Sequence, residues 1–191
     1  MKTPPKRSIL FLSVTGEEQG LLGSQYYAVT PIYPLAKTAA NINMDELNQW
    51  GPTSDLTVIG LGNSELDDYA RAAAAEQKRT LKPDAEPEKG FYYRSDHFNF
   101  AKVGVPAFDP EAGTDYIGKP VGFGMALRDS FTMNDYHKPS DEIKPGWNMS
   151  GAVQDLDLSL TMGYRIANAA KLPEWRAGNE FRAAREKSLR P

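Results

Sequence analysis

Two adjacent glutamates, Glu17 and Glu18, are the residues whose type and position most directly imply chemistry. They follow an apolar run, residues 8–14, that is typical of a buried strand, and nearby glycines allow a tight turn into a helix beginning near Leu21. Carboxylates at the C-terminal end of such a strand face a crevice of the sheet. One can ligate a metal while the other acts as a general base, which suggests metal-assisted hydrolysis. In isolation, a Glu-Glu pair is more often solvated surface.

Few other residues are available as metal ligands. The sequence has no cysteine and only two histidines, His97 and His137, so a metal would be held by carboxylates and imidazoles. Asp45 is a candidate because it ends an alternating polar and apolar segment, residues 39–45, that predicts a strand. His137 lies in a region rich in Gly, Pro and Asp, residues 109–147, where no periodicity predicts a helix or a strand.

These candidate residues need a scaffold, and the pattern predicts alternating strands and helices. We expect strands at 8–14, 39–45, 56–61 and 105–108, and helices at 21–29, 64–78, 95–102 and 150–170. The segment 81–89, with its prolines and charges, predicts a surface loop. This order of elements favours an α/β fold with a mostly parallel sheet.

The composition narrows the classes of function. A chain of 191 residues that is 40% hydrophobic can bury a core and predicts one domain. Its formal net charge of -3 and the lack of a basic block argue against a nucleic-acid partner. No apolar stretch reaches the roughly 18 residues of a transmembrane helix, and the first residues lack a signal-peptide pattern. We therefore expect no membrane partner and no export signal in this sequence.

Four segments taken together resemble one known family. They are Gly16-Glu17-Glu18 with the glycine-rich run to Ser24, Asn43-Met44-Asp45, Arg94-Ser95-Asp96-His97-Phe98 followed by Gly104-Val105-Pro106, and Tyr136-His137-Lys138-Pro139-Ser140-Asp141. Their joint order is similar to that of the co-catalytic zinc aminopeptidases, metallopeptidase family twenty-eight, whose relatives include glutamate carboxypeptidase II and glutaminyl cyclase. The resemblance implies a three-layer α/β/α fold with a mostly parallel mixed sheet, zinc as the cofactor and a peptide as the substrate.

The resemblance also implies roles for individual residues. Glu17 would be the general base, Glu18 and His137 would ligate one zinc, and Asp45 would ligate a second. Tyr136 would stabilise the oxyanion that forms during hydrolysis. A complete family site therefore holds two zinc ions.

Three further residues are expected to bind substrate or to support the ligands. In the family, the segment that contains Asp96 and His97 lies on the wall of the cleft; the alternatives are that Asp96 caps a helix and that His97 is a structural histidine. Asp141 is expected to orient the loop of His137, and an exposed loop aspartate is the alternative. The aromatic run 91–93 is expected to pack in the core, with a place in a substrate pocket as the alternative.

The first residues depart from the family pattern. Family members place a histidine and a bridging aspartate upstream of the glutamate pair, whereas residues 1–16 contain no His, Asp or Glu. We therefore expect a partial catalytic domain at 1–172, lacking the first strands of the family sheet, and a charged C-terminal tail at 173–191. Such a domain would bind fewer zinc ions or none, and would be weakly active or inactive. Its unpaired sheet edge would favour a homo-oligomer or a complementing chain.

The expected activity is zinc-dependent removal of an N-terminal residue from a peptide. Two alternatives stay open: a non-catalytic protein-binding module of the same fold, and acyl transfer of the glutaminyl-cyclase type. Because many relatives are exported, the resemblance also implies a periplasmic or secreted parent.

Overall fold

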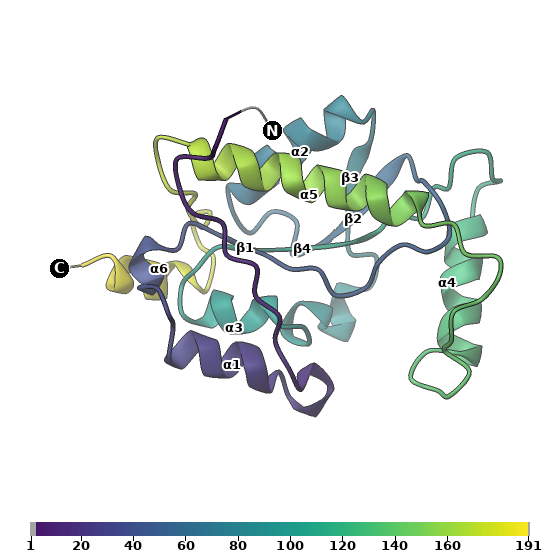
Figure 1. The fold of residues 1–191 in the computed structure, drawn as a ribbon, viewed down its shortest axis with the longest axis horizontal. Helices are drawn as coiled ribbons and strands as arrows, with labels where there is room; N and C mark the ends of the chain where they lie inside the picture. Colours follow the sequence, from purple (N-terminus) through teal and green to yellow (C-terminus); the bar gives the residue numbers. More distant parts are fainter. Residues whose placement is uncertain (1–2, 191) are drawn as a thin grey trace.

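The computed structural model describes residues 3–190 and contains a four-stranded mixed sheet. Its strands are β1 (Asn41–Ile42), β2 (Asp55–Ile59), β3 (Thr80–Pro83) and β4 (Ala107–Ala112). They lie in the order β1-β4-β2-β3 (Figure 1). β1 pairs with β4 and β2 pairs with β3 in parallel, whereas β2 and β4 are antiparallel. The prediction of a mostly parallel mixed sheet is confirmed.

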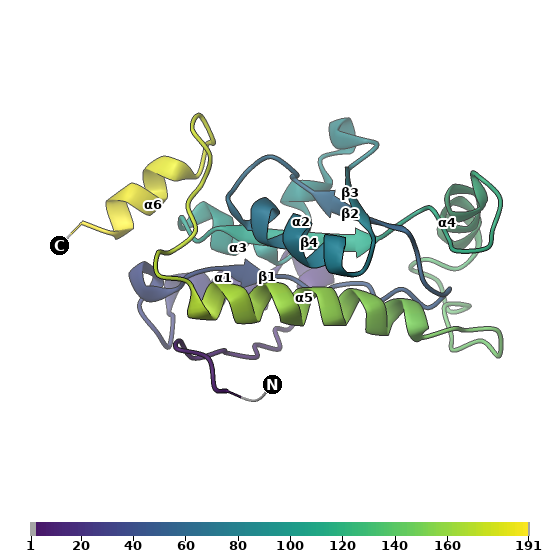
Figure 2. The ribbon, with the colours of Figure 1, turned by 90° about the horizontal axis from the view of Figure 1, so that it is seen from above.

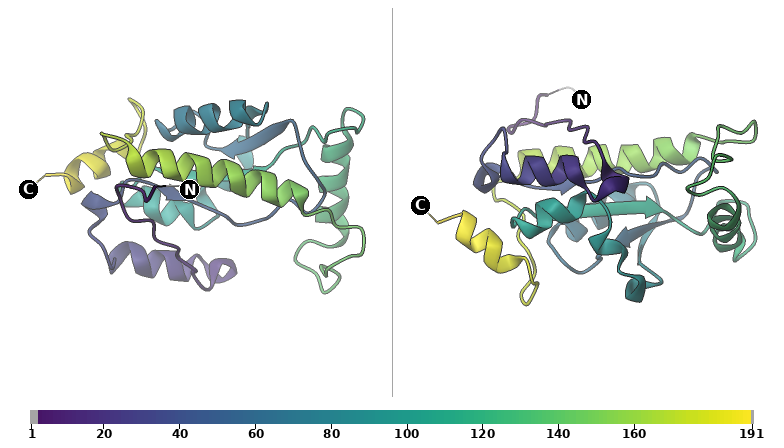
Figure 3. Two further views of the ribbon diagram at one scale, coloured as in Figure 1. Left: turned by 45° about the horizontal axis from the view of Figure 1, so that its top comes forward. Right: turned by 90° about the horizontal axis from the view of Figure 1, so that it is seen from below.

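Helices cover both faces of this sheet. They are α1 (Leu22–Val29), α2 (Leu66–Glu76), α3 (His97–Lys102), α4 (Phe123–Asn134), α5 (Ser150–Asn168) and α6 (Arg182–Ser188), with 3-10 turns at Glu17–Gln19, Leu35–Lys37, Pro87–Lys89 and Phe91–Tyr93. α2 and α5 pack together on one face, and α1 and α3 lie side by side on the other (Figure 3). The three-layer α/β/α arrangement is therefore confirmed. Among the described helices, none combines the length and the apolar surface that a bilayer crossing requires.

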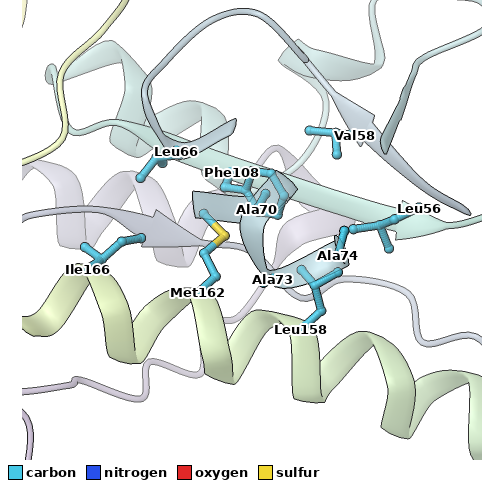
Figure 4. Packing of buried hydrophobic residues seen from close by; sticks show 10 residues of the cluster. All are labelled: Leu56, Val58, Leu66, Ala70, Ala73, Ala74, Phe108, Leu158, Met162 and Ile166. Atoms are coloured by element: carbon cyan, nitrogen blue, oxygen red, sulfur yellow. The ribbon is translucent and has the colours of Figure 1, made fainter. Parts of the chain in front are cut away.

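Alternation along the strands explains how one sheet supplies two cores. Leu56 and Val58 of β2 face α2 and α5, while Ile59 faces the opposite side. Phe108 and Ala107 of β4 divide between the two sides in the same way. The first core is completed by Leu66, Ala70, Ala73, Ala74, Leu158, Met162 and Ile166 (Figure 4).

The second core reaches into the C-terminal residues. Trp175 and Phe181 are buried in it, and Trp175 Nε1 donates a hydrogen bond of 2.9 Å to the carbonyl oxygen of Gly104. A Cβ on Gly104 would lie 2.4 Å from the backbone nitrogen of Arg185, so only glycine fits this close approach. The segment after residue 172 is therefore packed on the domain, while the domain boundary itself stays a prediction.

The prediction that residues 8–14 form a buried strand is wrong. They run on the β1 side of the sheet (Figure 2), and no backbone hydrogen bond within the described residues joins them to a strand. Leu10 is 47% exposed and Phe11 83% exposed. An apolar run becomes a buried strand only where a neighbour pairs with its backbone groups, and β1 at this edge has only 2 residues. Glu17 and Glu18 thus follow an extended segment outside the sheet.

Two other elements differ from the sequence-based expectation. The predicted surface loop at 81–89 overlaps β3, whose proline and charges are tolerated because β3 is an edge strand. The region 109–147, predicted to be irregular, contains most of β4 and the whole of α4. α4 stands at one end of the molecule, and Gly124 is its only buried residue (Figure 1). A helix that buries so little carries a weak apolar periodicity, so the sequence did not reveal it.

Candidate active site

Glu17 and Glu18 lie on a single 3-10 turn that leads into α1. Gly16 precedes this turn with a φ of 68°, in the left-handed region that favours glycine. Gly23, in the first turn of α1, lies so close to the incoming chain that an added Cβ would be 2.5 Å from the backbone nitrogen of Thr15. These two glycines let the turn pack closely against α1. The backbone from which the Glu17 and Glu18 side chains extend is therefore held in place.

The fold brings His137 to Glu18 although most of the chain separates them in sequence. His137 Nε2 lies 2.7 Å from Glu18 Oε1, and the ring of Tyr136 stacks on that of His137 with the centroids 3.8 Å apart. His137 has a φ of 58°, a conformation that is uncommon outside glycine and recurs at functional sites. The two residues predicted to ligate one zinc are therefore neighbours, and the predicted oxyanion-stabilising residue is beside them.

Asp45 and Asp96 complete an acidic cluster around Glu17. The pKa of Glu17 is raised, first by burial and then by the nearby carboxylates of Asp45, Glu18 and Asp96. Asp45 follows β1, and its Oδ2 accepts a hydrogen bond of 2.7 Å from Ser95 Oγ. Four of the five acidic residues predicted for the site, Glu17, Glu18, Asp45 and Asp96, therefore share one electrostatic environment.

Asp96 precedes α3 without capping it through its side chain. Instead, Ser24 Oγ of α1 donates a hydrogen bond to Asp96 Oδ1, and Asn99 Nδ2 donates one of 2.8 Å to Ser24 Oγ. Burial raises the pKa of Asp96, and Asp45 raises it further. These contacts place Asp96 where α1 meets α3, on the wall of the acidic cluster, and not in the role of a helix cap.

A polar chain behind Asp45 was missed by the sequence-based reasoning. Asn43 Nδ2 donates to Ser95 Oγ and to Asp109 Oδ1, each at 2.9 Å, and Ser95 in turn donates to Asp45. His97 Nδ1 lies 3.2 Å from Asp109 Oδ2. Such outer contacts orient a ligand side chain. The sequence could have revealed Asn43, because it lies two residues before Asp45 and hence on the same face of a strand. No local pattern indicated that Asp109 would join this chain.

His97 lies inside the protein and not on the site surface. It is 0% exposed, and the ring of Tyr92 meets it edge-on with centroids 4.7 Å apart. Burial lowers the pKa of His97 to about 4 and raises the pKa of Asp109 to about 7. Because a side chain without exposed surface cannot touch a substrate, the geometry favours a supporting role for His97.

Asp141 lies apart from the acidic cluster. Its backbone N–H donates a hydrogen bond of 3.0 Å to Lys138, and its side chain lines a separate cavity of about 180 Å³. Within residues 3–190 its carboxylate forms no hydrogen bond or ion pair with His137. Its role in orienting the His137 loop stays a prediction.

A larger cavity, of about 390 Å³, opens beside Glu17 and Glu18. Tyr93 lines this cavity, whereas Tyr92 is buried in the second core. In the aromatic run 91–93, Tyr92 thus packs in the core, as expected, while Tyr93 takes the alternative place in a pocket. Such a concave space next to the acidic cluster could receive a substrate.

The donor set fits only part of a zinc site. Zinc in proteins is usually held by three or four protein ligands. Across the part of the chain that the structure describes, no group of three or more His, Cys, Asp or Glu side chains is arranged to hold a metal ion. Glu18 and His137 supply two donors in direct contact, and Asp45 lies in the same cluster.

Two solved aminopeptidase structures share this fold. The aminopeptidase LapA from Legionella pneumophila aligns with a TM-score of 0.60 and 16% identity, over 90% of this chain and 43% of that chain. The aminopeptidase from Aneurinibacillus sp. strain AM-1 aligns with a TM-score of 0.53 and 20% identity, over 82% of this chain and 33% of that chain. The chain thus spans less than half the length of either structure. The fold is therefore that of an aminopeptidase-like α/β protein.

A family model described as Peptidase family M28 matches residues 1–161. The chain belongs to this family, which confirms the resemblance seen in its motifs and supports a peptidase-like function. The family is generally metal-dependent. The search of curated proteins found no match.

Proposed function

We propose that the chain carries part of the active site of a zinc-dependent exopeptidase of the aminopeptidase type. The observation that supports this most directly is the 2.7 Å contact between Glu18 and His137, the two residues predicted to ligate one zinc. Membership in Peptidase family M28 supports peptide hydrolysis as the class of reaction.

Five residues of the site have a role in this proposal. Glu18 and His137 would hold one zinc ion, and Asp45 would contribute to the binding of a second. Bound zinc would lower the pKa of a water molecule and polarise the scissile carbonyl. Glu17 accepts the proton of the attacking water and passes it to the leaving amine. Tyr136, stacked on His137, donates its hydroxyl to the oxyanion.

The same proposal includes weak activity of this chain by itself. A metal with two protein ligands is held less firmly than one with three or four. We therefore expect that the purified chain, loaded with zinc and washed, retains fewer than the two zinc ions of a co-catalytic site. Mass spectrometry under native conditions measures the zinc content, and hydrolysis of a leucine anilide by the same sample measures turnover.

Two retained zinc ions with rapid turnover would show that the site is complete and would contradict this part of the proposal. No zinc binding at any concentration would instead favour a non-catalytic protein-binding module of the same fold. Pyroglutamate formation from a glutaminyl peptide, without cleavage of the anilide, would indicate acyl transfer of the glutaminyl-cyclase type.

We also propose that a second copy of the chain covers the exposed residues 8–14. Phe11 is 83% exposed there. The segment runs on the β1 side of the sheet (Figure 2), and exposed apolar residues favour association. The variant Phe11→Asp should shift sedimentation toward the monomer, and Val121→Asp, at a residue that is fully exposed elsewhere, should not. A wild-type chain that sediments as a monomer at high concentration would exclude self-association.

A further inference from the structure

The cavity beside Glu17 and Glu18 carries two cationic side chains that the proposed mechanism does not use. Arg94 lies just before α3 and Lys102 at its end, and both line the cavity of about 390 Å³. Among residues 3–190, neither cation has a carboxylate within ion-pairing distance. The cavity therefore offers two charges that a ligand can neutralise.

Aromatic rings hold these cations without neutralising them. Lys102 Nζ lies 4.8 Å from the centroid of the Phe98 ring, and Arg94 Cζ lies 5.8 Å from that of Phe91. Glu180, an acidic residue nearby in the fold, accepts a hydrogen bond of 2.8 Å from the hydroxyl of Tyr93. Its carboxylate is thus engaged by Tyr93, which lines the cavity, and within the described residues it forms no ion pair with either cation.

Hydrogen bonds hold one lining residue of the cavity, Asn99, in place. Asn99, which also lines the cavity and is 2% exposed, donates from Nδ2 to the carbonyl oxygen of Leu21 at 3.1 Å and to Ser24 Oγ at 2.8 Å. α1 and α3 are therefore fixed relative to each other. The same cavity is lined by the carboxylates of Glu17 and Glu18 and by the two cations.

We propose that Arg94 and Lys102 bind a carboxylate group of the peptide substrate. A guanidinium offers paired donors that match a carboxylate, and an ammonium adds a further charge. The carboxylate can belong to an acidic side chain at the N-terminal residue or to the free C-terminus of a dipeptide. This inference rests on the proposed peptidase function and assigns its substrates to peptides that present a negative charge close to the scissile bond.

The test measures binding, so it does not depend on turnover. The ¹⁵N-labelled chain is titrated without zinc with Glu-Ala amide, with Gln-Ala carrying a free C-terminus, and with Gln-Ala amide, which has neither carboxylate. Two-dimensional NMR reports the affinity and the amides that shift. One of the two carboxylate peptides should bind about three- to tenfold more tightly than the neutral amide, as expected for two exposed ion pairs. Which of them does so identifies the source of the carboxylate.

The variants Arg94→Gln and Lys102→Gln should each remove about half of this preference in free energy, so that a tenfold preference falls to about threefold. Lys119→Gln is the matched control, because Lys119 Nζ also rests over a phenylalanine ring, 5.1 Å from the centroid of Phe123, but lines no part of this cavity. Equal affinity for the three peptides would overturn the inference. So would a preference that is undiminished in Arg94→Gln and Lys102→Gln, or one that Lys119→Gln reduces as much as they do. None of these results bears on the zinc measurements that test the proposed function.

Discussion

Replacing Glu18 by glutamine should lower the zinc affinity of the chain by on the order of a hundredfold, because even outer residues of zinc sites typically contribute ten- to a hundredfold. The same replacement at the neighbouring Glu17 should leave the affinity nearly unchanged. Glu18 contacts His137 at 2.7 Å, whereas Glu17 is assigned to proton transfer outside the ligand set. Competition with a chromogenic zinc chelator at fixed pH measures both variants.

This pair of variants is a sharp test, since both make the same chemical change at adjacent positions. The side chains of Glu18 and His137 are 63% and 52% exposed, so neither glutamine nor alanine there should disturb the fold. His137→Ala should therefore reproduce the loss seen with Glu18→Gln. An equal effect of the Glu17 and Glu18 variants would assign both as ligands. No effect of Glu18→Gln or His137→Ala would place the bound zinc elsewhere.

Replacing Asp55 by asparagine should lower the free energy of unfolding at pH 7 by about 2–4 kcal/mol, because a buried carboxylate that accepts several charge-assisted hydrogen bonds is lost and one buried donor is left without an acceptor. Asp55 is fully buried at the start of β2. Its carboxylate accepts hydrogen bonds from the backbone N–H groups of Asp115 at 2.9 Å and Thr114 at 3.2 Å, and lies 3.0 Å from Lys82 Nζ. Asparagine would remove the negative charge that faces Lys82. Its side-chain NH2 group would also point at a backbone N–H group, so that one hydrogen-bond donor would face another. Urea denaturation measures the loss.

The same residue gives stability a defined dependence on pH. Burial acts to raise the pKa of Asp55, but the hydrogen bonds from Asp115, Lys82 and Thr114 outweigh it and hold the pKa below its usual range. A depressed pKa contributes stability above the unfolded value of about 3.9, and this contribution is lost as the pH falls through the folded value. The difference between wild type and Asp55→Asn should therefore shrink below about pH 4.

Asp157→Asn is the control for this prediction. Asp157 is exposed on α5 and forms no ion pair within the described residues, so its replacement should change stability little at any pH. If Asp55→Asn were as stable as wild type at pH 7, the buried network around Asp55 would not contribute to folding. A difference that stays constant into the acid range would assign its effect to packing and not to charge.

Local chemistry determined the elements that the sequence predicted correctly. The turn that carries Glu17 and Glu18 follows from glycines whose backbone angles are a property of single residues, such as the φ of 68° at Gly16. Likewise, the apolar pattern predicted a strand at β2 and a helix at α5, since side-chain direction repeats with a fixed period in strands and helices. The order of the four motifs along the sequence indicated the family.

Relations between distant segments were decided only by the tertiary structure. The contact of Glu18 with His137, and the chain from Asp109 through Asn43 toward Asp45, depend on β1 pairing with β4 and on where the loop before α5 returns. No local pattern encodes such placement, because it arises from how separate elements pack against one another. The same reason explains the exposed residues 8–14: the sequence determined that they are apolar, but burial requires a neighbouring strand, and the short β1 does not provide one.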